Sequence, residues 1–158
     1  MNRIRLTSVL ILVAAIGGLA AQAQVEPSSA TAMAPGAPQP VVAPDGSQTW
    51  PSGLVIRHLK EGAGPAPAAT DTVKVHYRGT FPDGKEFDSS YTRGQPAEFP
   101  LNRVIPCWTE GVQKIKVGGK AKLVCPPGIA YGAKGAGGVI PPNATLHFDV
   151  ELLGIAGR

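Results

Sequence analysis

The sequence lacks the features that mark several common classes of protein. Lys and Arg number 15 against 11 Asp and Glu, and they are scattered, with no basic run interleaved with aromatic residues. This small charge excess argues against nucleic acid as a partner. Two cysteines with no histidine close to either in sequence do not make a zinc site. We therefore expect no metal, no cofactor and no nucleic acid.

Other absences narrow the range of folds. The chain has no internal repeats, and its Gly-rich stretch over residues 132–138 lacks the lysine and hydroxyl ending of a phosphate loop. The Pro-, Ala-, Ser- and Gln-rich residues 24–48 contain no heptad pattern. Such a composition cannot bury enough surface to fold, so these residues are expected to form an extended, disordered linker without a dimerisation helix. We expect a monomer.

The first 23 residues have the pattern of a secretory signal peptide. Arg3 and Arg5 precede an apolar run over residues 6–20, and a small-x-small cleavage pattern ends at Ala23. The alternative is an uncleaved membrane anchor, but the run is short for a span of about 20 residues. No cysteine follows to carry a lipid. The expected protein is exported, most simply to a bacterial periplasm, and has no membrane attachment after cleavage.

Residues 49–158 are expected to form one domain dominated by strands. Val73, Val75 and Tyr77 alternate with polar neighbours, as in a strand with one buried face. Turn chemistry at residues 82–84 predicts a hairpin. Strands are predicted over residues 54–59, 72–80, 85–88, 97–99, 120–125 and 145–153.

One stretch has the period of a helix. Apolar residues recur there at three- and four-residue steps: Ile105, Trp108, Val112 and Ile115. Pro106 suits the first turn, and Gly118 with Gly119 is expected to end the helix. A single helix must bury its apolar face against the sheet. The expected fold class is therefore α+β: a twisted antiparallel β-sheet of about five strands wrapped around one short α-helix.

The two cysteines fall on these elements. Cys107 lies at the start of the predicted helix, and Cys125 ends a strand on its inward face, so both could meet between helix and sheet. In an oxidising compartment they are a candidate disulfide worth roughly 3 kcal/mol. Two buried free thiols are the alternative.

Many of the inward positions are large and apolar. They comprise Tyr77, Phe87, Phe99, Val104, Ile105, Trp108, Tyr131, Ile140 and Phe148. A plain hydrophobic core would account for them. However, several flank loops, Tyr131 and Ile140 bracket the Gly-rich stretch, and Asp88 places a carboxylate directly beside Phe87. These positions favour a pocket.

Five segments in this order resemble the FKBP-type peptidyl-prolyl cis-trans isomerases. They are VHYRG at 75–79, DGKEFDSS at 83–90, VI at 104–105 with Trp108, AYG at 130–132 and IPPNATL at 140–146. The resemblance covers about residues 50–156, and its motifs lie within 71–157. It implies the same FKBP-like fold, a sheet wrapped around one short helix.

The resemblance also implies residue roles. The catalytic set is Tyr77, Phe87, Asp88, Ile105, Trp108, Tyr131 and Phe148, and the substrate-binding set is Phe99, Val104 and Ile140. Trp108 would be the floor under a proline ring, with the Ile105 N–H and the Tyr131 hydroxyl donating to substrate carbonyls. Asp88 would lie at the rim and Ile140 on a flap.

The implied activity is isomerisation of X–Pro bonds in exported proteins. Proline-containing peptides and unfolded exported proteins would be the partners, and macrolide inhibitors would bind in the same pocket. A peptide-binding chaperone module with incidental catalysis is the alternative function.

Overall fold

The computed structural model describes residues 37–157. The expected signal peptide and the first part of the expected linker, residues 24–36, lie outside these described residues. The strands are β1 (Val41–Val42), β2 (Gln48–Thr49), β3 (Val55–Lys60), β4 (Thr72–Thr80), β5 (Glu86–Ser89), β6 (Ala97–Pro100), β7 (Lys120–Cys125) and β8 (Leu146–Ile155). The helices are α1 (Ser90–Arg93) and α2 (Pro106–Val112), with short 3₁₀ turns at Leu101–Arg103, Pro127–Ile129 and Gly132–Lys134.

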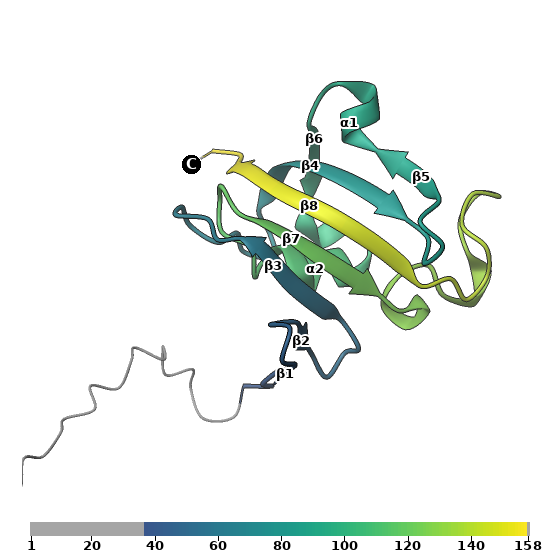
Figure 1. Cartoon of the computed structure of the whole chain (residues 1–158). Coiled ribbons are helices and arrows are strands. Elements are labelled where there is room, and N and C mark those ends of the chain that lie inside the picture. The colour runs from purple at the N-terminus through teal and green to yellow at the C-terminus, as the bar shows by residue number, and fades with distance from the viewer. Residues whose placement is uncertain (1–36, 158) are drawn as a thin grey trace, which may run out of the picture. The chain divides into compact units, whose positions relative to one another are not determined.

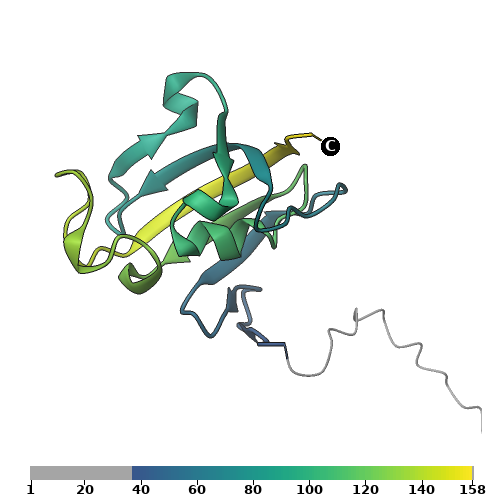
Figure 2. The same ribbon diagram turned by 180° about the vertical axis from the view of Figure 1, so that it is seen from behind.

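All eight strands belong to one antiparallel sheet, in the order β1-β2-β3-β7-β8-β4-β5 (Figure 1). The first half of β4 also pairs with β6, and its second half pairs with β5. Figure 2 shows α2 lying across one face of the twisted sheet. The α+β prediction is confirmed, with more strands than the five expected.

Alternation along the strands explains why one face is buried. In β4, Val73, Val75 and Tyr77 are at most 5% exposed, whereas Lys74 and Arg78 face solvent. β7 and β8 bury alternate residues in the same way. The buried side chains of these central strands meet α2 in a single hydrophobic core.

Helix α2 is shorter than the sequence predicted. It ends at Val112, so the expectation that Gly118 and Gly119 end it is wrong. Two tighter turns follow, in which Lys114 N–H donates to Gly111 O and Ile115 N–H donates to Val112 O. A three-residue step keeps Ile115 on the core side, where it is fully buried. The apolar pattern therefore continues beyond the residue at which the helix ends.

The second correction concerns the expected linker. Strand β1 and the first residue of β2 fall within it. Because β1 pairs with β2 and β2 pairs with β3, this part of the expected linker extends the sheet. Trp50 follows β2 and is only 9% exposed, with the Lys114 ammonium 3.5 Å from its ring centroid. A cation over an indole face is favourable. This contact joins the segment after the hairpin to the turns that follow α2.

Cys107 and Cys125 form a disulfide that joins the start of α2 to the end of β7. Their Cα atoms are 5.7 Å apart, and both side chains are fully buried. The disulfide prediction therefore holds, and the alternative of two buried free thiols does not. No helix within residues 37–157 is long and apolar enough to span a membrane.

Candidate functional site: an aromatic pocket between sheet and helix

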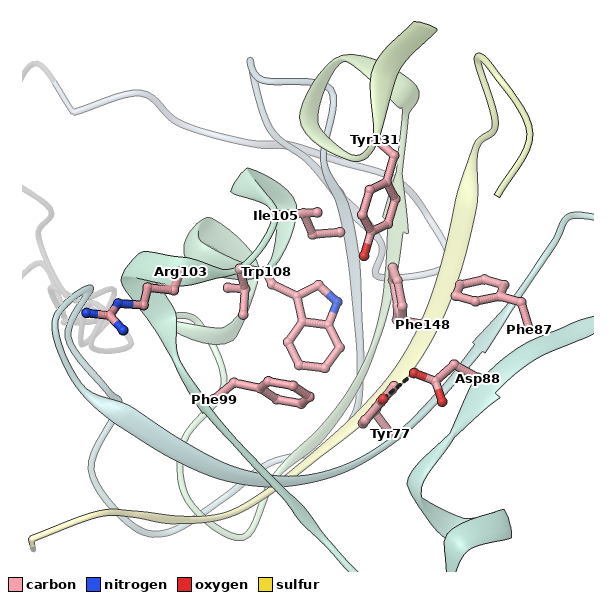
Figure 3. A pocket seen from close by; sticks show the side chains of 10 residues that line it. Tyr77, Phe87, Asp88, Phe99, Arg103, Ile105, Trp108, Tyr131 and Phe148 are labelled. Atoms are coloured by element: carbon pink, nitrogen blue, oxygen red, sulfur yellow. Dashed lines mark hydrogen bonds between the residues drawn. The ribbon is translucent and has the colours of Figure 1, made fainter. Parts of the chain in front are cut away.

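A cavity of about 460 Å³ lies between the sheet and α2 (Figure 3). It is lined by Tyr77, Phe87, Asp88, Phe99, Arg103, Val104, Ile105, Trp108, Tyr131 and Phe148. Of the predicted site residues, only Ile140 is missing from this lining, and only Arg103 was not predicted. The structure therefore brings together residues spread over 72 positions of sequence, from 77 to 148.

Three aromatic rings stand edge-on around the Trp108 indole. The centroid of Tyr77 is 5.2 Å away at an interplanar angle of 86°, and the centroids of Phe99 and Phe148 are each 5.4 Å away at 85° and 87°. Edge-to-face contacts at these distances suit the quadrupoles of aromatic rings. Trp108 itself is 4% exposed. The indole of Trp108 thus forms an apolar floor, and the three surrounding rings form aromatic walls perpendicular to it.

Each wall residue comes from a different strand. Tyr77 lies on β4, Phe87 on β5, Phe99 on β6 and Phe148 on β8. Three of these rings contact Trp108 of α2, and Phe87 packs edge-on against Phe148. Gly79 makes room for Phe87, since a Cβ atom at that position would lie 2.5 Å from the Phe87 ring. A larger residue at 79 would have to displace this part of the wall.

Asp88 holds the polar edge of the pocket in a three-residue network. The Tyr77 hydroxyl and the Arg93 guanidinium both donate to its carboxylate, and Arg93 also donates to the Tyr77 oxygen at 3.0 Å. Burial raises the pKa of Asp88, but the two hydrogen bonds, together with the Arg93 charge and a backbone hydrogen bond at Ser89, lower the net pKa. Burial and the bond to Asp88 raise the pKa of Tyr77. Asp88 is thus an ionised acceptor at neutral pH, already bound by its neighbours.

Two hydrogen-bond donors remain available at the cavity. The Ile105 N–H, just before α2, and the Tyr131 hydroxyl donate no hydrogen bond to any residue from 37 to 157. Figure 3 shows the Tyr131 hydroxyl directed toward the space above Phe148 and Trp108. Tyr131 is 41% exposed, so it reaches inward from the rim.

Ile140 lies beside this cavity rather than in it. It lines a second cavity of about 410 Å³ that shares Phe87, Asp88 and Tyr131 with the first. The Ile140 side chain is 6% exposed, and its backbone pairs with Ala136 across the tip of the loop. The predicted flap residue therefore borders an adjoining cavity rather than the pocket itself.

Comparisons with known proteins agree with this geometry. The family described as FKBP-type peptidyl-prolyl cis-trans isomerase matches residues 64–153. The chain belongs to this family. The prediction made from the five motifs is confirmed, and the FKBP-type fold explains why one helix and four strands converge on a single pocket.

Relatives of known structure and sequence cover the same domain. The FKBP-type isomerase FkpA of Escherichia coli is 58% identical over 110 residues, which are 70% of this chain and 40% of FkpA. Its crystal structure gives a TM-score of 0.68 and covers 70% of this chain and 51% of that one. FK506-binding protein 1 of Dictyostelium discoideum is 53% identical over 103 residues, covering 64% and 96%. The chain spans about 40% of the length of the FkpA relatives.

Arg103 is the lining residue of this FKBP-type domain that sequence reasoning missed. It ends the 3₁₀ turn Leu101–Arg103 and is exposed. A polar, exposed arginine in a loop has no periodic or motif signature. Only its position next to Val104, a predicted wall residue, could have drawn attention to it.

No group of three or more His, Cys, Asp or Glu side chains within residues 37–157 is placed to hold a metal ion. The polar groups at the cavity are instead hydrogen-bond donors and one carboxylate, Asp88, which is paired with Arg93. This set can orient a peptide but offers no side chain prepared for nucleophilic attack.

Proposed function

We propose that this chain is a peptidyl-prolyl cis-trans isomerase that holds proline over Trp108 and stabilises the twisted X–Pro amide. The main support for this proposal is the cavity itself. Its floor is the Trp108 indole, and the rings of Tyr77, Phe99 and Phe148 surround that indole edge-on. All the residues assigned as catalytic from the sequence border this cavity. Membership of the isomerase family supports the same activity.

The reaction asks for no reactive side chain. The barrier to rotation is roughly 18–20 kcal/mol and comes from amide resonance. Rotation therefore breaks no covalent bond. Uncatalysed exchange takes roughly 10–100 s. A catalyst needs only to bind the rotated amide more tightly than either planar form.

An apolar pocket does this because the twisted amide has lost resonance and is less polar than the planar forms. Walls of aromatic carbon exclude water, which otherwise stabilises the planar, more polar amide. Trp108 and Phe148, at 4% and 5% exposure, provide such a dry surface. When the amide moves from water into the pocket, the twisted transition state therefore loses less stabilisation by water than the planar ground states do.

The two available donors supply orientation. The Ile105 N–H and the Tyr131 hydroxyl donate to substrate carbonyls, which fixes one part of the peptide while the other turns. The Tyr77–Asp88–Arg93 network holds the Tyr77 ring upright against Trp108. Asp88 thus serves as a positioning residue, and Ile140 contacts peptide residues beyond the proline.

The proposed substrates are proline-containing segments of unfolded exported proteins, bound by a monomer in the bacterial periplasm. Residues 1–23 support export as a cleaved signal peptide. The Cys107–Cys125 bond fits an oxidising compartment. The same pocket is proposed to take macrolides of the kind named in FK506-binding protein 1.

The deciding experiment measures exchange of an X–Pro peptide by NMR, without a coupled protease, in the presence of the purified chain. We expect acceleration that a macrolide inhibitor blocks. A folded, oxidised sample that binds the peptide without accelerating exchange would establish the alternative, a peptide-binding chaperone module.

The two tryptophans provide a matched test of the pocket. Trp108→Leu should lower the catalysed rate strongly, because it removes the floor. Trp50→Leu changes the other buried indole, which packs under Lys114 away from the cavity, and should keep the rate while lowering stability. Equal rates in both variants would contradict the pocket assignment.

A further inference from the structure

Arg103 places a positive charge at the solvent-exposed edge of the pocket. The residue lines the cavity, yet Figure 3 shows its guanidinium pointing away from Trp108. Its stem therefore contributes to the wall while its charged group stays in solvent. A group placed there meets the residues that flank the proline rather than the proline ring.

This charge is not neutralised within the described structure. The cavity lining contains two charged residues, Asp88 and Arg103, and Asp88 is paired with Arg93. Arg103 makes no ion pair or side-chain hydrogen bond with any residue from 37 to 157. Glu110, an acidic residue close in sequence, lines a neighbouring groove of about 560 Å³ that shares Val104 with the cavity, and it forms no ion pair with Arg103. The pocket mouth thus has a net positive charge on its Arg103 side.

We propose that Arg103 is a specificity-determining residue that favours substrates with an acidic side chain next to the proline. An extended peptide advances about 3.3–3.6 Å per residue, so a side chain one or two residues from the proline reaches the rim. The opposite side of the cavity adjoins the space lined by Ala136, Val139 and Ile140, where the charged residue is Asp88, already paired with Arg93. The two exits therefore differ in chemistry, and only the Arg103 side attracts a carboxylate. This inference rests on the proposed isomerase function.

The test compares kcat/KM for two pairs of peptides by protease-free NMR exchange. One pair carries Glu or Gln directly before the proline, and the other carries them directly after it. For the wild-type protein we expect the Glu peptide of at least one pair to exceed its Gln partner about two- to fivefold, the range for an exposed ion pair. Added salt should reduce the ratio, because solvent-exposed charges are screened.

Three variants separate this role from a general effect of charge. Arg103→Gln should bring the Glu-to-Gln ratio to about one, while Arg103→Lys should retain most of it. Lys74→Gln removes the same charge from the outer face of β4, outside the cavity lining, and should leave the ratio unchanged.

The outcomes distinguish the two proposals. A ratio that persists in Arg103→Gln, or a wild-type ratio of one in both pairs while the Gln peptides are accelerated, would overturn the role of Arg103 alone. If the wild-type protein accelerates none of the four peptides, the proposed function fails and this inference fails with it.

Discussion

Two tyrosines of nearly equal exposure allow the contribution of one hydroxyl to be measured at the residue scale. Tyr131 is 41% exposed at the pocket, and Tyr91 is 42% exposed with its hydroxyl donating to Glu151 at 3.1 Å. Tyr131→Phe should lower kcat/KM about two- to tenfold, the value of one hydrogen bond to a substrate carbonyl. Its free energy of unfolding should change by less than about 0.5 kcal/mol, because the site is exposed.

Tyr91→Phe is the matched control for this experiment. Burial and the bond to Glu151 raise the pKa of Tyr91 to about 12, so the residue has its own polar partner away from the cavity. NMR exchange rates and urea unfolding curves for both variants give the comparison. Equal catalysis in Tyr131→Phe and Tyr91→Phe would remove Tyr131 from the set of substrate donors.

The Asp88 carboxylate predicts how stability depends on acid. Its pKa is lowered in the folded protein, so its contribution to stability is present above its unfolded value of about 3.9 and is lost as pH falls through the lower folded value. Tyr77 has a raised pKa, so its contribution is lost only as pH rises above about 10. Between these limits the network should contribute a constant amount to stability.

Asp88→Asn tests this dependence through urea unfolding between pH 2 and 7. We expect the variant to be less stable than wild type at pH 7, with the difference shrinking below about pH 4. Glu98→Gln removes an exposed carboxylate of β6 that has no ion-pair partner within the described residues, and should show a smaller difference. A gap between wild type and Asp88→Asn that stays constant down to pH 2 would show that ionisation of Asp88 does not stabilise the fold.

At the scale of elements, the disulfide is the covalent link between α2 and the sheet. Replacing both cysteines by alanine should lower the free energy of unfolding by about 2–4 kcal/mol, mainly because the unfolded chain gains freedom. The edge-to-face contacts around Trp108 involve neither cysteine, so catalysis by the folded variant should stay close to wild type.

Reductant provides the internal control for this prediction. A strong reductant should lower the stability of the wild-type protein toward that of the double variant and should not affect the variant itself. Urea unfolding with and without reductant measures both. Unchanged stability in the double variant would mean that helix packing alone holds α2 on the sheet.

The sequence predicted strands better than it predicted where the helix ends. The ranges predicted for β4 and β7 match their observed bounds, because polar and apolar residues alternate over residues 72–78 of β4 and 120–123 of β7. The end of α2 could not be read from periodicity, since three-residue turns after Val112 keep the same face buried. Hairpin β1–β2 was missed for a different reason: its two-residue strands have no pattern of their own and are ordered by pairing with β3.

The residues of the pocket also divide into those that the sequence predicted and those that it did not. Its aromatic residues were predictable because each alternates inward on a strand or flanks a family motif. Arg103 and the neutralisation of Asp88 by Arg93 depend on where loops and a short helix bring side chains together. Contacts of that kind come from tertiary structure, and no local pattern of residues specifies them.

At the scale of the whole molecule, the proposed export can be tested together with the disulfide. The proposal places cleavage after Ala23, so protein recovered from the periplasm of a bacterial host should begin at Gln24 and contain no free thiol. The same chain produced without residues 1–23 stays in the reducing cytosol, and both thiols should then be free and react with a thiol reagent after denaturation. N-terminal sequencing and thiol titration of the two preparations provide the test. Full-length protein retaining residues 1–23 in the membrane fraction would replace the signal peptide with an uncleaved anchor, while an oxidised cytosolic product would show that the bond forms without export.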